Sequence, residues 1–140
     1  LRECVRRLSD MGTRISLMDE RGEIAGLAEG VPQFRIGRCT DILEGCTKKQ
    51  AALMLLKTMS PALVAMDEIT SPEDIEAVAL CAHCGTAVLA AAHAAGPSDL
   101  RRRPLYRRLL SLGVLEWVLT IEQKDGKRSY RMEKTEGTTC

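Results

Sequence analysis

The chain has 140 residues, of which 45% are hydrophobic and 28% charged, a balance typical of one globular domain with a core of ordinary size. Its formal net charge is +1 and only 3% of its residues are aromatic, so neither a strong electrostatic field nor a set of stacking side chains predicts a nucleic-acid partner. Six cysteines without a recognisable secretory signal favour reduced thiols, and we expect a cytoplasmic protein.

A helix is predicted at the start of the chain. Leu1, Val5 and Leu8 recur at helical spacing, and Gly12 stands where a helix commonly ends. Because the first residue is not methionine and already fits the middle of this pattern, we expect the chain to be a piece of a longer protein.

A short strand is predicted next, at residues 14–18, and it ends in two acids, Asp19 and Glu20. Residues 23–27 are predicted to return as a second strand, with the turn between the two strands at residues 21–22. Glycines and a proline then predict a loop that lasts until about residue 41.

Two helices are predicted on either side of the following strand. Thr47 is suited to cap a helix that reaches about Met59. Ser71 and Pro72 are suited to the N-cap and first position of another helix, which runs to about Cys84. The buried face of the first of these helices is predicted to contain Ala51, Met54, Leu55 and Thr58.

The segment between these helices, residues 63–68, is the most informative part of the chain. Four apolar residues end in adjacent carboxylates, Asp67 and Glu68, which is the Walker B pattern of enzymes that hydrolyse nucleotides. In such sites the first carboxylate holds Mg²⁺, directly or through water, and the second orients and deprotonates the attacking water. The alternative interpretation is a buried strand that merely ends at two solvated acids.

A strand buried on both faces is predicted at residues 86–91, which are apolar almost throughout, and His93 follows it. Strands that alternate with helices predict an α/β fold, with a mainly parallel sheet covered by helices. Because ligands of such folds bind beyond the carboxyl ends of the strands, the acids and His93 are expected to meet at that edge.

The remainder of the chain predicts a helix and a hairpin. The helix is expected at residues 104–112, and the hairpin has its strands at residues 115–123 and 128–133. We expect one domain over residues 1–134 and a polar tail over residues 135–140.

Taken together, these segments resemble the sporulation stage III AA family of ATPases, which are relatives of the type II and type IV secretion ATPases. The supporting segments cover nearly the whole chain and lie at residues 15–25, 30–33, 38–46, 59–69, 92–93 and 100–104. The resemblance implies a P-loop ATPase core of RecA-like fold. It also implies that this chain begins just after the Walker A motif, so that the first strand and the phosphate-binding loop are missing.

The resemblance implies a function as well. ATP and Mg²⁺ are the expected cofactors, and the expected assembly is a homo-oligomer in the form of a hexameric ring. The ATPase would drive or assemble the channel complex between mother cell and forespore, together with that complex's membrane proteins, in the cytoplasm or against the inner face of the mother-cell membrane. The alternative is a non-catalytic assembly module, and the isolated chain is expected to be inactive.

The same resemblance assigns roles to the acids. Asp67 is expected to bind Mg²⁺ and Glu68 to act as the catalytic base. Asp19 and Glu20 correspond to the acidic box of secretion ATPases, so Asp19 is a candidate for cofactor binding and Glu20 for positioning the attacking water. A salt bridge between Glu20 and Arg21 is the alternative.

Basic residues complete the predicted site. His93 corresponds to the histidine box of secretion ATPases and is expected to sense the γ-phosphate, with a structural histidine at a strand end as the alternative. Arginine suits phosphate and subunit-bridging contacts because its planar fork donates two hydrogen bonds. Arg38 is the first candidate for such a contact and Arg21 a further candidate for cofactor binding. The run 101–103 is better interpreted as a solvated or partner-facing surface.

Cysteines raise one further alternative. Cys81 and Cys84 have the spacing of half a zinc site, and Cys39 with Cys46 would have to supply the other half, which would make the protein a zinc-dependent regulator. The spacing of the second pair is too long for a zinc knuckle, so packing in the core is the better interpretation of these thiols.

Overall fold

The structure is a computed structural model that describes residues 1–135, and it divides the chain into two compact units. The first unit runs from Leu1 to Ala92 and the second begins at His93. Within the described residues, no helix is both long enough and apolar enough to cross a membrane. The predicted extent of the domain, residues 1–134, stays a prediction, and most of the predicted tail lies outside the described residues.

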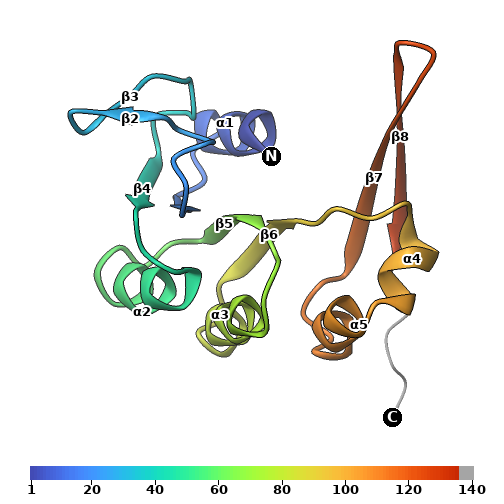
Figure 1. Cartoon of the computed structure of the whole chain (residues 1–140). Helices are drawn as coiled ribbons and strands as arrows, with labels where there is room; N and C mark the ends of the chain where they lie inside the picture. Colours follow the sequence, from blue (N-terminus) through green and yellow to red (C-terminus); the bar gives the residue numbers. More distant parts are fainter. Residues whose placement is uncertain (136–140) are drawn as a thin grey trace. The chain divides into compact units, whose positions relative to one another are not determined.

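The first unit contains three helices and six strands among the described residues (Figure 1). In chain order they are α1 (Arg2–Asp10), β1 (Ile15–Asp19), β2 (Leu27–Ala28), β3 (Val31–Pro32), β4 (Thr40–Glu44), α2 (Lys48–Thr58), β5 (Leu63–Glu68), α3 (Pro72–His83) and β6 (Ala87–Ala91).

A parallel sheet of four strands forms the centre of this unit, in the order β4-β1-β5-β6. Leu17 of β1 lies opposite Ile42 of β4 on one side and Ala65 of β5 on the other. The carboxyl ends of β1 and β5 are therefore neighbours at one edge of the sheet. The predicted α/β fold with a parallel sheet is confirmed.

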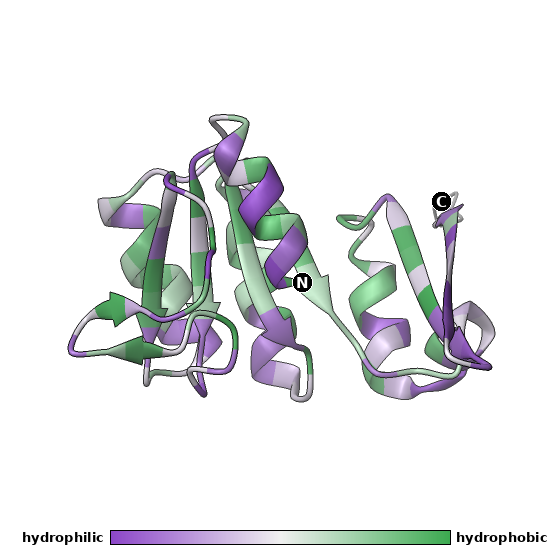
Figure 2. Ribbon diagram, turned by 90° about the horizontal axis from the view of Figure 1, so that it is seen from above, coloured by the Kyte–Doolittle hydropathy of each residue, from purple (hydrophilic) through white to green (hydrophobic). Residues whose placement is uncertain are grey.

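Helices cover both faces of the sheet. Helix α1 packs on one face, where Val5, Leu17 and Ala65 belong to one buried hydrophobic cluster. Helices α2 and α3 contact each other and lie on the opposite face (Figure 1). A sheet buried on both sides needs apolar residues at successive positions, and the strands of this unit are drawn largely in green in Figure 2.

Both helices on that second face begin with a capping box. The Thr47 hydroxyl accepts a hydrogen bond from the Gln50 amide, and the Ser71 hydroxyl accepts one from the Asp74 amide. In each case the side chain of the third helical residue accepts a hydrogen bond from the amide of the cap residue, which satisfies amides that a helix start otherwise leaves without partners. The predicted starts of both helices are confirmed.

The predicted strand at residues 23–27 is wrong. Strand β2 begins only at Leu27 and pairs with β3, not with β1. The physical reason is local, because the amides of Ile24 and Ala25 donate to the Asp19 carboxylate and are thereby taken out of any strand ladder. The predicted loop up to residue 41 is interrupted by β3 and by the edge strand β4, whose residues are only partly buried or exposed.

The buried face of α2 is rotated relative to the predicted one. Ala51 and Leu55 are buried as predicted, whereas Met54 is 54% exposed and Thr58 is also exposed. Lys48 and Ala52 complete the buried face in their place. The buried face of α2 therefore includes a lysine, although the hydrophobic pattern predicts apolar residues on that face.

The second unit contains two helices and a hairpin among the described residues. Its elements are α4 (Pro97–Arg102), α5 (Pro104–Ser111), β7 (Trp117–Lys124) and β8 (Lys127–Lys134). The predicted hairpin is confirmed, and its turn consists of Asp125 and Gly126, which both have positive φ. Helix α4 was not predicted from the sequence.

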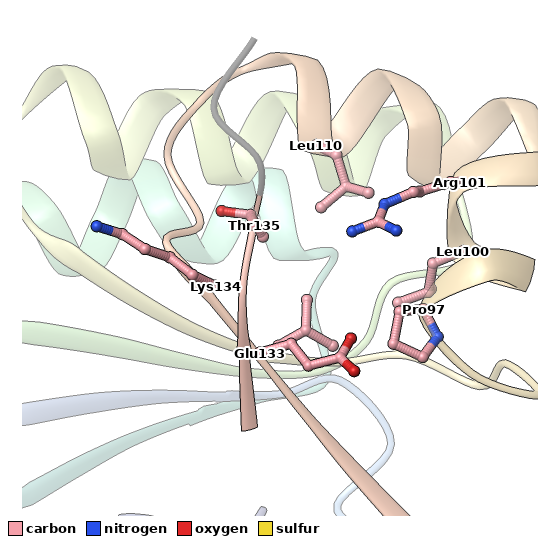
Figure 3. A pocket seen from close by; sticks show the side chains of 8 residues that line it. Pro97, Leu100, Arg101, Leu110, Glu133, Lys134 and Thr135 are labelled. Carbon is pink, nitrogen blue, oxygen red and sulfur yellow. The ribbon is translucent and has the colours of Figure 1, made fainter. Parts of the chain in front are cut away.

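A small cavity lies in this second unit, and Figure 3 shows the side chains of Arg101, Leu110 and Glu133 around it. Its volume is about 30 Å³. That is room for about one water molecule, whereas small-molecule sites measure at least about 300 Å³. This cavity is therefore too small to hold a nucleotide.

Candidate active site at the carboxyl edge of the sheet

The two acids of the Walker B pattern end strand β5, as predicted. The Asp67 side chain is 7% exposed, while Glu68 is only partly buried. The pairing of β5 with β6 shifts register between Met66 and Glu68, so Asp67 stands at an irregularity of the ladder. Such irregularities commonly re-aim a side chain at a functional site.

Lys48 is the residue that organises this edge, and it was not predicted from the sequence. Its side chain is 3% exposed. The Lys48 Nζ lies 2.7 Å from Oδ1 of Asp67 and 3.0 Å from Oε2 of Glu20. Oδ1 of Asp74 is 3.7 Å from the same nitrogen. One ammonium group thus brings together two predicted site residues, Glu20 and Asp67, with a third acid.

The sequence did carry a signal for Lys48. The residue lies three, four and seven positions before Ala51, Ala52 and Leu55, which places it at the start of their buried face. Adjacent lysines after a helix cap are ordinarily solvated, and Lys49 follows that rule with 47% exposure. The helical period of the buried residues therefore indicated the burial of Lys48 better than the residue type did.

Asp74 links the cluster to the start of α3. Its Oδ2 accepts hydrogen bonds from the Thr70 amide at 2.8 Å and the Ser71 amide at 3.0 Å. Because these bonds fix the carboxylate, Oδ1 is held facing Lys48. The capping box of α3 is consequently part of the same site as the strand ends.

The charge of the cluster is not balanced. Three carboxylates and one ammonium give a formal charge of −3 + 1 = −2. Burial acts to lower the pKa of Lys48, but the hydrogen bonds to Asp67 and Glu20 outweigh it and the pKa is raised. Lys48 is therefore charged at neutral pH, and the remaining negative charge favours a further cation.

Asp67 also has an unsatisfied oxygen. The Lys48 ammonium lies beside Oδ1 as an ion pair, and within residues 1–135 the buried Oδ2 has no hydrogen-bond partner. A buried carboxylate oxygen without a donor is costly, so this oxygen is a candidate to receive a water molecule or a cation. Mg²⁺ binds carboxylate oxygens, so Asp67 suits this ion as a single protein ligand, while no group of three or more acidic, histidine or cysteine side chains within the described residues is arranged to hold a metal.

Asp19 has a different role from its neighbour Glu20. The Asp19 side chain is fully buried, and its carboxylate accepts hydrogen bonds from the Ile24 amide at 3.0 Å and the Ala25 amide at 2.8 Å. This carboxylate holds the loop after β1 in place. It is committed to backbone donors, so we leave it out of the proposed ligand set.

Arg21 makes its ion pair outside the cluster of acids around Lys48. It pairs with Glu23 at 3.8 Å, and both side chains are more than half exposed. Glu20 pairs with Lys48 instead, so the alternative of a salt bridge between Glu20 and Arg21 is wrong. The predicted role of Arg21 in cofactor binding stays a prediction without a contact to support it.

Arg38 lies at the opposite edge of the sheet from Asp67. It precedes β4, whose first residue pairs with Ile15, the first residue of β1. There it borders a shallow hollow of about 310 Å³ together with Arg6, Phe34 and Arg35. Within one chain Arg38 therefore does not join the carboxylates, and any contact with that site would have to come from another copy.

His93 is the first residue of the second unit, so its predicted place beside the acids stays a prediction. Its backbone carbonyl accepts a hydrogen bond from the Arg103 guanidinium at 3.1 Å. This bond lies within the second unit and connects the segment before α4 to the start of α5.

Cys81 is buried in α3, and burial raises the pKa of its thiol to about 11. At neutral pH this thiol is protonated, which disfavours its use as a zinc ligand because zinc binds thiolates. Cys84 is exposed at the end of the same helix. The position of Cys81 supports packing in the core as its role.

A difference in thiol reactivity follows from these positions. When the folded chain is alkylated with iodoacetamide at pH 8, we expect Cys4 and Cys84 to react and Cys81 to remain unmodified, since its thiol is both buried and protonated. Peptide mapping by mass spectrometry measures this. Modification of Cys81 at the rate of Cys84 would contradict the structure, and denatured protein, in which every thiol reacts, is the control.

Sequence comparison gives two matches. The family described as "Sporulation stage III, protein AA" matches residues 1–133. The chain is also 34% identical over 126 residues to Stage III sporulation protein AA of Bacillus subtilis (strain 168). That match covers 86% of this chain and 41% of the relative, so the chain spans about two fifths of the relative's length.

Comparison of structures gives a similar fold in a known ATPase. The X-ray structure of the Legionella pneumophila ATPase DotB matches with a TM-score of 0.54 and 15% sequence identity. The match covers 95% of this chain and 39% of that chain. At this identity the likeness concerns the fold, and it confirms the predicted ATPase-like α/β architecture.

Proposed function

The chain belongs to the sporulation stage III protein AA family, and from this premise we propose that it supplies the Mg²⁺-binding and catalytic acids of an ATPase. The observation that carries the proposal is the buried Oδ2 of Asp67, which has no hydrogen-bond partner among the described residues and lies in a cluster of formal charge −2. That environment suits a divalent cation at the carboxyl edge of a parallel sheet.

Each acid has a distinct role in this proposal. Asp67 holds Mg²⁺ directly or through a water molecule, and Mg²⁺ when bound neutralises charge on the β- and γ-phosphates of ATP. Glu68, the next residue at the end of β5, accepts a proton from the attacking water. Glu20, whose side chain is 39% exposed, is accessible enough to orient that water while it stays paired with Lys48.

The activity of a longer protein is a further part of the proposal, because the chain spans only 41% of its curated relative. We use the term family-length protein for a polypeptide of that full extent that contains this chain. In it we expect a hexameric ring that works on the channel complex between mother cell and forespore. Its expected place is the cytoplasm or the inner face of the mother-cell membrane.

A non-catalytic assembly module is the second candidate, and one observation favours it. Strand β7 exposes Trp117, Leu119 and Ile121, which are 52%, 46% and 56% exposed. These residues alternate along one face of the hairpin, and an exposed apolar face of this kind commonly marks a contact with another protein. The two candidates differ in whether nucleotide is turned over.

The experiment that tests the proposal measures binding and hydrolysis of Mg²⁺-ATP by the family-length protein and by this chain, at matched concentration. The proposal predicts turnover by the family-length protein that depends on Mg²⁺, and little or none by this chain alone. Binding and turnover absent from both would favour the assembly module.

Arg38 provides a test of the ring. In the family-length protein, Arg38→Ala is expected to lower ATP hydrolysis by roughly 10³-fold with little change in nucleotide binding, as loss of an arginine that acts across a subunit boundary does. The control is Arg35→Ala, which removes an arginine from the same hollow. Equal effects of the two substitutions on steady-state turnover would contradict a specific role for Arg38.

Mixing experiments locate the Arg38 contact. Because Arg38 and Asp67 lie at opposite edges of one sheet, rings assembled from Arg38→Ala and Glu68→Gln subunits are expected to regain part of the activity. Recovery arises where an intact Arg38 of one subunit faces an intact Glu68 of another. No recovery in mixed rings would contradict action between subunits.

A further inference from the structure

Lys48 lies at a position where electrostatics disfavours a cation. It is the first residue of α2, where the positive end of the helix dipole repels a cation. Its side chain is also 3% exposed, although lysine is rarely buried without a partner. Two independent unfavourable terms therefore act on one side chain, and its contacts with acids must offset both of them.

Those contacts join segments that are distant in the sequence. Glu20 follows β1, Asp67 belongs to β5 and Asp74 lies in the first turn of α3. The Lys48 Nζ is within 4 Å of a carboxylate oxygen from each of them. Without this ammonium the three acids would carry a formal charge of −3 in a largely buried space and would repel one another.

We propose that Lys48 is a positioning residue that takes the place of a metal ion in the resting site, holding Glu20, Asp67 and Asp74 together before Mg²⁺ and nucleotide bind. The inference rests on the proposed function, in that Mg²⁺ is the cation the site is expected to receive. Lys48 does not itself touch the reacting atoms in this account. It acts through the geometry of the carboxylates.

One carboxylate oxygen beside the lysine has no partner of its own among the described residues. Lys48 contacts Oδ1 of Asp67, whereas Oδ2 of the same carboxylate is buried and has no hydrogen-bond partner within residues 1–135. A divalent cation added to the cluster would change its formal charge from −2 to zero. Lys48 thus holds the three carboxylates close to one another. The formal charge of −2 that remains on the cluster equals in size the charge of the Mg²⁺ expected to bind there.

The test is thermal unfolding of this chain carrying Lys48→Met, measured in EDTA and in millimolar Mg²⁺ without nucleotide. Methionine keeps much of the length and apolar character of the lysine stem but removes the charge. In EDTA the melting temperature is expected to fall by roughly 10 °C or more, because removal of one partner leaves buried like charges unpaired. Mg²⁺ is expected to restore at least half of that loss.

Lys49→Met is the matched control. The neighbouring lysine pairs with Glu76 at 2.6 Å, but both side chains are close to half exposed. Exposed pairs of this kind contribute little, so its melting temperature is expected to remain near that of the unchanged chain, with and without Mg²⁺. Comparison of the two variants separates the buried ammonium from the general effect of removing a lysine.

A second variant keeps the test decisive if Lys48→Met does not fold in EDTA. Adding Glu20→Gln to Lys48→Met returns the formal charge of the cluster to −2, which leaves Asp67 and Asp74 as its acids. This double variant is expected to melt at a higher temperature in EDTA than Lys48→Met alone and to gain less from Mg²⁺. A double variant that is no more stable than the single one would overturn the electrostatic account.

The remaining outcomes are equally informative. Loss of stability in Lys48→Met that no divalent cation reverses would overturn the proposal and leave Lys48 as a purely structural ion pair. No loss at all would overturn it too. Because nucleotide is absent from every sample, these results do not depend on ATP hydrolysis, and a family-length protein without turnover would refute the proposed function while leaving the role of Lys48 intact.

Discussion

Replacement of Glu68 by glutamine is expected to lower ATP hydrolysis by the family-length protein by roughly 10²- to 10⁴-fold, the usual contribution of a positioned base. Mg²⁺-ATP binding is expected to persist, since glutamine preserves the shape of the side chain and Asp67 remains in place. Steady-state turnover and equilibrium binding, measured on the same preparation, separate the two effects.

Glu73→Gln is the control for this substitution. Glu73 is an exposed glutamate in the first turn of α3, at the start of the same helix that carries Asp74. It lies outside the proposed site, and its replacement is expected to leave turnover nearly unchanged. If Glu68→Gln hydrolysed ATP as fast as the Glu73→Gln protein, Glu68 would not be the base.

Replacement of Asp19 by alanine is expected to destabilise this chain by about 2–5 kcal/mol, because two backbone amides would lose their acceptor. Both amides, those of Ile24 and Ala25, donate to a carboxylate that is fully buried. Ala25 is itself fully buried, so water cannot readily replace the lost acceptor. Denaturant unfolding monitored by circular dichroism measures the loss.

Two further variants serve as comparisons for Asp19→Ala. Asp41→Ala changes an exposed aspartate on the neighbouring strand β4 and is expected to alter stability by less than about 0.5 kcal/mol. Asp19→Asn keeps one acceptor oxygen and is expected to be intermediate. An Asp19→Ala chain as stable as the Asp41→Ala chain would show that the carboxylate does not hold the loop.

Strand β5 and the helices beside it were predictable because their signals are local. Four apolar residues before Asp67 describe a strand buried on both faces, and the capping residues Thr47 and Ser71 mark the helix starts. Each of these signals depends on neighbours within a few positions. The order of the parallel strands then follows from the general packing of α/β units.

The features that sequence reasoning missed depend on which partners particular polar side chains find, nearby in the sequence for Asp19 and distant for Lys48. The loop after β1 is shaped by one carboxylate, Asp19, which recruits amides that would otherwise be available to a strand. Lys48 is buried only because Glu20, Asp67 and Asp74 converge on it from three other segments. Hydrophobic periodicity predicts which face of a helix is buried, but it does not predict which polar group will find its partners there.

The site itself was therefore predictable in part. Asp67 and Glu68 became candidates through their pattern, and Glu20 through a family resemblance. The internal cation that joins Glu20 to Asp67 required the structure. Arg38 was predicted from its residue type, which suits phosphate contacts. Within its own chain it lies at the amino-terminal edge of the sheet, opposite the edge that carries Asp67.

The most direct test of the central claim is an experimental structure of the family-length protein with Mg²⁺ and a non-hydrolysable ATP analogue. The account predicts Mg²⁺ beside Oδ2 of Asp67 and the γ-phosphate within reach of Glu68, at the carboxyl ends of β1 and β5. A nucleotide bound elsewhere, with the cluster of Lys48, Glu20, Asp67 and Asp74 unchanged and distant from it, would contradict the account.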